Sequence, residues 1–155
     1  MYTWGQCPGT GHGEALVNKP MLLQDLSSKN VVSARTCFHS ACVTKARKVL
    51  TWGFVCCGRL GHRDERVQYS PKRIEALVGV EVKQVSCGQL HTAVSNEDGH
   101  VYYTFGDGAN GALGHGEKET MTSPVLVQAL EKHHITQVQC GEYHTMALTS
   151  SGMFA

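Results

Sequence analysis

The chain of 155 residues has no apolar run approaching the roughly 18 residues that a membrane-spanning helix requires. Its first residues lack the basic stretch and the apolar core of a secretory signal peptide. Charge of one sign is also scarce, since 14 Lys and Arg against 13 Asp and Glu leave a formal net charge of +1. This balance excludes a global field that would draw nucleic acid or anionic lipid. We expect a soluble intracellular protein, cytoplasmic or nuclear, with no membrane insertion.

The cysteines do not indicate a disulfide framework or a metal site. Their number is odd, seven, and Cys87 and Cys140 fall at equivalent places of a repeat described below. This placement favours small buried residues over paired thiols. The neighbours Cys56 and Cys57 lack the spacing of zinc-ligand pairs, and we expect them in a loop. We expect no metal and no cofactor.

The chain does contain an internal repeat. Residues 85–94 read VSCGQLHTAV, and nearly the same line returns at residues 138–148 as VQCGEYHTMAL. Both the cysteine and the histidine of this line recur after 53 residues, and a looser copy places His39 52 residues before His91. Self-similarity at a fixed period is the signature of a repeat protein.

Three further landmarks keep nearly the same period. The run Gly-Arg-Leu-Gly-His at residues 58–62 returns as Gly-Ala-Leu-Gly-His at 111–115, with a looser forerunner at 9–13. The other two landmarks are a proline, at Pro20, Pro71 and Pro124, and an aromatic-glycine pair, at Trp4-Gly5, Trp52-Gly53 and Phe105-Gly106. Agreement of independent landmarks makes a chance match untenable.

Each repeat reads as about four short strands. Runs of β-branched and aromatic residues closed by a glycine lie at 1–4, 49–52 and 101–105. Period-two alternation at 80–85 and 135–138 indicates half-buried strands. The segment that follows each Ser-Pro pair fits a strand at its start or a short helix, and the pattern alone leaves both open. The Asp98-Gly99 pair predicts a hairpin into the next unit.

Repeated sets of four short strands are typical of a β-propeller, and the high glycine content excludes a helical solenoid. The sequence predicts an all-β fold of about three four-stranded blades that form part of a ring. All 155 residues belong to one repeat domain. Its approximate repeats are 1–47, 48–99 and 100–152, with 153–155 opening a further blade.

These motifs together resemble the repeats of the regulator of chromosome condensation family. The resemblance covers the whole chain and is specific in repeats two and three, whereas the segment 34–40 of repeat one lacks the expected glycine and threonine. It implies a seven-bladed ring, so we expect either a piece of a longer protein or a short form that pairs with another chain or with itself. The repeat residues are Trp4, Trp52, Gly58, Gly61, Gly88, His91, Thr92, Gly111, Gly114, Gly141, His144 and Thr145.

The repetition bears on what these residues do. Because an active site is needed once, a histidine present in every repeat is better explained as a structural group that hydrogen-bonds backbone at a turn. We expect Gly88 and Gly141 to adopt positive φ, so that Gly88→Val damages the fold. Residues 106–111 match Gly-x-Gly-x-x-Gly, but no helix can follow them, which excludes a phosphate site. The chain is not predicted to be an enzyme.

We favour a non-enzymatic scaffold for protein-protein interaction, which binds its partner through the loops that vary among repeats. The first such loop contains Arg63, Asp64, Glu65 and Arg66, and the others lie at 117–122 and 45–48.

The resemblance also implies two alternative functions. The founding member of the family is a guanine-nucleotide exchange factor for the small GTPase Ran, and an acidic loop residue matters there. Here the residues before the repeated histidines are Phe38, Leu90 and Tyr143, so no exchange residue can be carried over. A chromatin-associated module would be expected to carry a basic face or tail, and the sequence gives no strong nucleic-acid signal.

Overall fold

The computed structural model describes residues 1–13, 16–99 and 102–152, and short antiparallel strands dominate them. The strands in these residues are β1 (Tyr2–Gly5), β2 (Val17–Leu22), β3 (Val31–Thr36), β4 (His39–Thr44), β5 (Val49–Gly53), β6 (Gln68–Arg73), β7 (Val82–Cys87), β8 (His91–Asn96), β9 (Tyr102–Gly106), β10 (Met121–Leu126), β11 (Ile135–Cys140) and β12 (Thr145–Thr149). Single-turn 3₁₀ helices η1 (Gln24–Leu26), η2 (Glu75–Leu77) and η3 (Gln128–Leu130) follow β2, β6 and β10. Within the same residues, no helix is long and apolar enough to cross a membrane.

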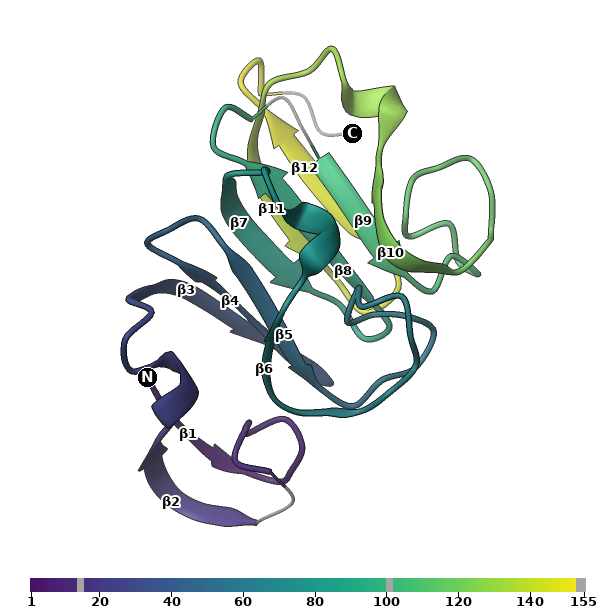
Figure 1. Ribbon diagram of the computed structural model, residues 1–155. Coiled ribbons are helices and arrows are strands. Elements are labelled where there is room, and N and C mark those ends of the chain that lie inside the picture. Colours follow the sequence, from purple (N-terminus) through teal and green to yellow (C-terminus); the bar gives the residue numbers. More distant parts are fainter. Residues whose placement is uncertain (14–15, 100–101, 153–155) are drawn as a thin grey trace.

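The strands form four sheets that follow one another along the chain (Figure 1). Two sheets are complete antiparallel blades, β3-β4-β5-β6 and β7-β8-β9-β10, and the two-stranded sheets β1-β2 and β11-β12 stand at the ends. The predicted all-β fold and its four-stranded blade are confirmed. The strands counted from the sequence as about three blades are distributed as two whole blades and two half blades.

The sequence repeat and the blade are out of phase. The unit that begins near residue 48 supplies β5 and β6 to one blade and β7 and β8 to the next. The junction between those pairs is the 3₁₀ helix η2, whereas the tight turn at Asp98-Gly99 joins β8 to β9 inside a blade. Each repeat therefore links two neighbouring blades covalently.

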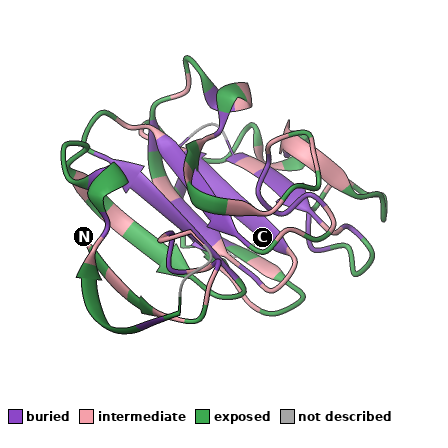
Figure 2. Ribbon diagram, turned by 60° about the horizontal axis from the view of Figure 1, so that its bottom comes forward, coloured by how far each residue is buried: buried purple, intermediate pink, exposed green. Residues whose placement is uncertain are grey.

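The position of a strand within its blade explains how far the strand is buried and which strands contain proline. Strands β3 and β11 both pack against β7, so these three strands lie at the inner edge where blades converge. The middle strands β4, β5, β8 and β9 are almost wholly buried, whereas β6 at the outer edge is mostly exposed (Figure 2). Pro20, Pro71 and Pro124 all lie in outer strands, because proline has no N–H to donate to a further strand.

The segment that follows each Ser-Pro pair, for which the sequence pattern allows either a strand or a short helix, contains both. In the second repeat β6 holds Pro71 and gives way to η2, and η1 and η3 follow the outer strands of the other repeats. Two predicted features, the start of a strand at Val101 and the opening of a further blade at 153–155, lie outside the described residues.

Packing between blades depends on an aromatic side chain set against a glycine of the preceding blade. Trp52 on β5 is 1% exposed and lies against Gly11, and its Nε1 donates to the Gly9 carbonyl at 2.9 Å. Phe105 on β9 is 0% exposed and lies against Gly61, where an added Cβ would meet the ring at 2.8 Å. The glycine makes room for the ring, and its φ of +76° suits the turn.

We predict that Gly61→Ala destabilises the protein more than Gly116→Ala. Both glycines have positive φ, at +76° and +82°, so both variants carry the backbone cost of about 1–2 kcal/mol. Only at Gly61 does the new Cβ also press on a buried ring, which adds about 1–3 kcal/mol of overpacking. Urea unfolding of both variants measures the difference, and equal losses would contradict the proposed aromatic-glycine packing.

Candidate functional site

The motif histidines join neighbouring blades through a threonine hydroxyl. His39 Nε2 lies 2.6 Å from Thr92 Oγ1, and that hydroxyl donates to the Arg59 carbonyl at 2.7 Å. A hydroxyl has one hydrogen, and here the carbonyl accepts it, so Thr92 must accept a hydrogen bond from the ring. The arrangement defines a neutral imidazole with its proton on Nε2.

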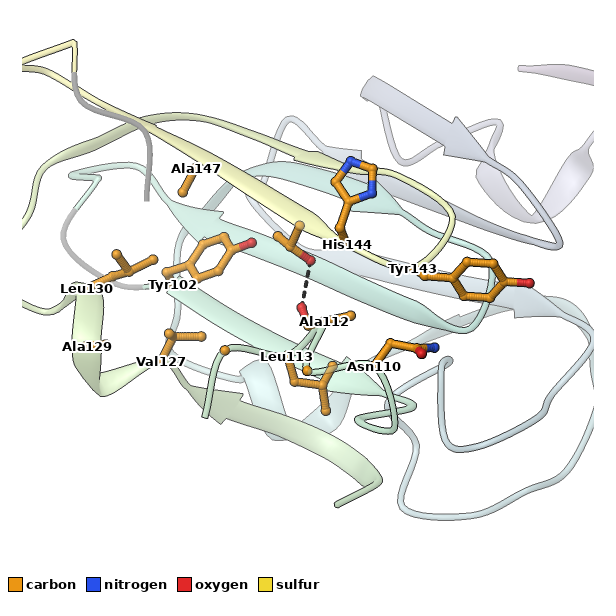
Figure 3. A pocket seen from close by; sticks show the side chains of 13 residues that line it. Tyr102, Asn110, Ala112, Leu113, Val127, Ala129, Leu130, Tyr143, His144 and Ala147 are labelled. Atoms are coloured by element: carbon orange, nitrogen blue, oxygen red, sulfur yellow. Dashed lines mark hydrogen bonds between the residues drawn. The ribbon is translucent and has the colours of Figure 1, made fainter. Parts of the chain in front are cut away.

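This set of hydrogen bonds, from an imidazole to a threonine hydroxyl and from that hydroxyl to a carbonyl, is called a relay below. The same relay recurs one blade further on. His91 Nε2 lies 2.9 Å from Thr145 Oγ1. The Thr145 hydroxyl donates to the Ala112 carbonyl at 2.8 Å, the dashed bond in Figure 3. The repeat pattern predicts that these rings bond backbone at their own turns, but in His39 and His91 the Nε2 atom bonds a side chain one repeat later. The motif His and Thr thus belong to two different bonds, one to each neighbouring blade.

A second relay stabilises each glycine-rich loop within its own repeat. Thr51 Oγ1 donates to the Leu60 carbonyl at 2.7 Å and lies 2.9 Å from His62 Nε2. The equivalent sets are Thr3 with the Thr10 carbonyl and His12, and Thr104 with the Leu113 carbonyl and His115. Sequence reasoning missed these threonines, although each one directly precedes the aromatic-glycine pair and so carried a readable signal.

Burial keeps the imidazoles of His39 and His62 neutral. Removal from water, with a smaller contribution from the positive charge of Arg59, lowers the pKa of His39 to about 3. Its Nδ1 is buried and has no hydrogen-bond partner among the described residues, so a second ring proton would be left unsatisfied there. Burial also lowers the pKa of His62 to about 4. These rings are poor candidates for proton transfer near neutral pH.

The prediction of positive φ at Gly88 and Gly141 is wrong. Neither is among the described glycines with positive φ. A side chain is excluded there for another reason, because the motif ring folds back over the glycine. A Cβ at Gly88 would lie 2.6 Å from His91 Nδ1, and one at Gly141 would lie 2.7 Å from His144 Nδ1.

The other repeat residues occupy two kinds of place. Gly58, Gly61, Gly111 and Gly114 all have positive φ in the loops that follow β5 and β9. Trp52 is buried between blades, whereas Trp4 is 62% exposed on β1. The structure therefore separates two aromatic residues that the sequence pattern treats as equivalent.

The variable loop at 63–66 is held in one conformation by its backbone. Arg63 donates its N–H to the Thr122 carbonyl of the next blade at 2.9 Å. Asp64 accepts the Arg66 N–H at 3.0 Å, a bond that lowers the pKa of the Asp64 carboxyl, and lies 3.7 Å from Lys72 Nζ. The side chains of Arg63, Glu65 and Arg66 are exposed around this frame.

Arg63 has a backbone conformation that the other repeats assign to glycine. Its φ is +63°, and the equivalent residues Gly13 and Gly116 have φ of +75° and +82°. The first repeat even makes the same bond, from Gly13 N–H to the Tyr69 carbonyl at 3.1 Å. A left-handed conformation is unfavourable for arginine, and such strain is concentrated where a side chain has a function.

The remaining candidates bring no ligand set together. In the described ranges, no group of three His, Cys, Asp or Glu is placed to hold a metal ion. Cys56 and Cys57 lie in the loop after β5, with their sulfurs 3.0 Å apart. Arg59 is 5% exposed and donates to the Phe54 and Gln89 carbonyls, which links that loop to the next blade.

Four-stranded antiparallel blades joined by histidine-threonine relays define a repeat protein of the β-propeller class. More narrowly, the chain belongs to the regulator of chromosome condensation (RCC1) repeat family, whose repeat pattern matches residues 48–95 and 98–148.

Known proteins agree with this assignment. The chain is 36% identical to the human E3 ubiquitin-protein ligase HERC2 over 158 residues, which cover 98% of the chain and 3% of HERC2. It is 35% identical to the Arabidopsis thaliana ultraviolet-B receptor UVR8, over 74% of the chain and 26% of UVR8. Human WBSCR16 superposes with a TM-score of 0.80 at 25% identity, over 97% of the chain and 40% of WBSCR16. The chain spans less than half the length of each of these proteins.

We predict that Thr92→Val destabilises the protein by about 1–3 kcal/mol, because the buried His39 ring and the Arg59 carbonyl each lose a partner. Thr92→Ser keeps the hydroxyl and should cost less, as the first repeat already uses Ser40 at this position. The exposed Thr120→Val serves as the matched control. Chemical denaturation measures all three, and a Thr92→Val loss no larger than that of Thr120→Val would contradict the relay.

We predict that stability falls as the pH drops below about 6.5. The unfolded chain takes up a proton on His39 near its ordinary pKa of 6.5, whereas the folded chain does so only at about 3. Between these values the unfolded state holds more protons, so His39 removes about 1.4 kcal/mol per pH unit. His39→Gln keeps an N–H donor without a titrating group, so denaturation midpoints measured from pH 7.5 to pH 4.5 should fall less steeply. Identical slopes would contradict the assignment.

Proposed function

We propose that this chain is a protein-interaction scaffold that binds a partner protein through the loop at 63–66. The observation that carries the proposal is the left-handed Arg63, which keeps a charged side chain at a position where the other two repeats have glycine. The relays also support the proposal of a scaffold, because they engage the recurring histidines in structural hydrogen bonds. A rigid frame of this kind leaves specificity to the loops.

The loop presents a compact arrangement of charge. Arg63 and Arg66 flank Glu65 on the exposed side, while Asp64 is turned toward Lys72 and the loop backbone. The corresponding segment of the third repeat, 116–119, carries Gly116, Glu117, Lys118 and Glu119 instead. Two neighbouring loops of different charge order suit recognition of a charged, folded surface, since electrostatic complementarity fixes orientation and partner choice.

The relatives favour a binding role for these repeats rather than one chemical activity common to all of them. HERC2 is a ubiquitin ligase, UVR8 an ultraviolet-B receptor and zebrafish Nek8 a serine/threonine kinase, which is 31% identical over 97% of the chain and 21% of Nek8. Proteins with such different activities share these repeats, which is what a general interaction module would produce. The yeast protein Prp20p, described by its binding to Gsp1p and histones, superposes with a TM-score of 0.81, but at 20% identity this shows the fold alone.

An exchange factor for a Ran-like GTPase is the alternative in the same binding class, and it would work by stabilising the nucleotide-free partner. The turns before the motif histidines end in Phe38, Leu90 and Tyr143, so the chain offers no acidic group directly before the ring. We therefore place partner binding ahead of exchange.

We predict that Arg63→Glu combined with Arg66→Glu weakens partner binding by about tenfold or more, with unchanged folding. Arg63→Gly should also weaken binding, yet stabilise the fold by about 1 kcal/mol, because it relieves the left-handed strain. Proteins retained by the chain are identified by mass spectrometry, and the affinity of each purified candidate is then measured by calorimetry.

The control for this experiment is Lys19→Glu, which reverses an exposed charge on β2. It should leave the affinity unchanged. Full affinity in the double Arg variant, or loss of affinity with Lys19→Glu alone, would place the interface outside the 63–66 loop.

A further inference from the structure

Two adjacent thiols meet in the loop that follows β5. Cys56 and Cys57 lie between β5 and β6, in a loop that contacts the next blade through Gly58 and Arg59. In an extended segment the side chains of adjacent residues point to opposite faces, which keeps their ends apart. Here the two sulfurs lie 3.0 Å from each other. The loop therefore presents a pair of thiols in contact rather than two separate cysteines.

The backbone at this pair departs from the repeat. Cys57 has a φ of +57°, the left-handed conformation that residues with a side chain adopt rarely. Its equivalent in the third repeat is Asn110, a residue type that tolerates this conformation better, yet Asn110 is not among the described residues with positive φ. The next residues, Gly58 and Gly111, have the same φ of +71°. The shared frame therefore does not impose the left-handed conformation on Cys57, and such strain is concentrated at functional positions.

Packing does not explain the two thiols. The third repeat has Ala109 and Asn110 at these positions, so the blade forms without sulfur there. Cys56 is exposed and Cys57 is half-buried, whereas Cys42 on β4 is buried in the core. A cysteine in the core behaves as a small apolar residue, but an accessible pair of thiols is placed for chemistry.

Hydrogen bonds from Arg59 hold the loop in this shape. Its Nε donates to the Phe54 carbonyl at 2.9 Å and its Nη1 to the Gln89 carbonyl at 2.8 Å. Its backbone N–H donates to the Cys56 carbonyl at 3.3 Å. Groups that a rigid frame keeps in contact react with each other far faster than the same groups moving freely. The two sulfurs are therefore preorganised to react together.

The two thiols differ in access and in protonation. Cys56 is exposed, so a dissolved reagent reaches its sulfur directly. The hydrogen bond to Cys56 raises the pKa of the Cys57 thiol to about 11, with smaller contributions from burial and from the negative charges of Cys56, Asp107 and Glu65. Cys57 is therefore the donor of that bond and keeps its proton at neutral pH. This division suits a first thiol that is oxidised and a second thiol that attacks the product.

We propose that Cys56 and Cys57 are a site of reversible covalent modification, at which hydrogen peroxide oxidises the two thiols to a disulfide. The Cys56 sulfur attacks one peroxide oxygen, the O–O bond breaks, and the products are a sulfenic acid on Cys56 and one water. The Cys57 sulfur then attacks the Cys56 sulfur, an S–S bond forms, and the sulfenic hydroxyl leaves as a second water with the Cys57 proton. The two thiols lose two electrons and the peroxide gains them.

Adjacency makes this disulfide easy to reduce. The Cα atoms of neighbouring residues are about 3.8 Å apart across a trans peptide bond. Unstrained disulfides join Cα atoms that are roughly 4.4–6.8 Å apart, so a bond between adjacent cysteines is strained. Strained and exposed disulfides are the ones that thiols open readily. The bond thus suits a modification that is reversed rather than a permanent cross-link.

Oxidation of the purified chain with about one molar equivalent of hydrogen peroxide tests the proposal. All seven cysteines are free, so a thiol count under denaturing conditions should fall from seven to five. Trypsin releases residues 49–59 as one peptide that contains Cys56 and Cys57 and no other cysteine. Mass spectrometry should find this peptide lighter by two hydrogen atoms, and reduced glutathione should restore its mass.

A variant and a matched control distinguish the pair from its neighbours. Cys57→Asn introduces the residue of the third repeat, so it should fold, form no disulfide within the peptide and leave a sulfenic acid on Cys56 that dimedone traps. Cys37 is the other exposed cysteine and lies near Arg59, which makes it the rival partner of Cys56. Cys37→Ser should still lose two thiols. Thermal unfolding establishes that both variants are folded.

A comparison with the free peptide 49–59 tests the role of the loop. With dimedone present, the ratio of disulfide to trapped sulfenic acid should be about tenfold higher in the folded chain than in the peptide, because only the folded loop holds the sulfurs together. Three results would overturn the proposal. They are a peptide 49–59 that stays reduced while Cys37 is oxidised, a disulfide that joins Cys56 to Cys37 or to a second chain, and equal ratios in chain and peptide.

Discussion

The position of each blade depends on a three-part hydrogen bond in which a neutral imidazole donates to a threonine hydroxyl, which in turn donates to a carbonyl. The three groups come from different strands or loops, so the bond forms only when neighbouring blades are in place. His39, Thr92 and Arg59 make it at one interface, and His91, Thr145 and Ala112 at the next. A buried hydroxyl that both accepts and donates satisfies the ring Nε2–H and the carbonyl at once, which is how this polar motif can lie inside an apolar core. His39 Nδ1 is the ring atom that has no partner among the described residues.

This bond joins neighbouring blades because the sequence repeat is out of phase with the blade. A repeat ends one blade and begins the next, so its histidine and threonine bond in opposite directions along the arc. The aromatic-glycine contact also joins neighbouring blades, since Trp52 packs on the glycine-rich loop of the preceding blade. Such a frame leaves its loops free to differ, as those at 63–66 and 116–119 do.

The sequence alone was sufficient for the fold class and the family, because recurrence reports the shared frame directly. It was not sufficient for the reasons behind individual residues, which depend on contacts between repeats. Gly88 was explained by backbone φ, whereas the His91 ring is what excludes a side chain there. The left-handed Arg63 could have been found by aligning it with Gly13 and Gly116, but its anchor on the Thr122 carbonyl required the neighbouring blade. The exposure of Trp4 likewise follows from the absence of a preceding blade in the described chain, which no local pattern records.

The most direct test of the relay is nitrogen NMR of the imidazole rings. We expect His39 and His91 to show one tautomer, protonated at Nε2 and unprotonated at Nδ1, with His39 retaining it as the pH is lowered through 6.5. Thr92→Val should change the Nε2 signal of His39 more than that of His91. Rapid exchange between tautomers, or protonation of His39 near pH 6.5, would contradict the claim that a buried, neutral imidazole joins the blades.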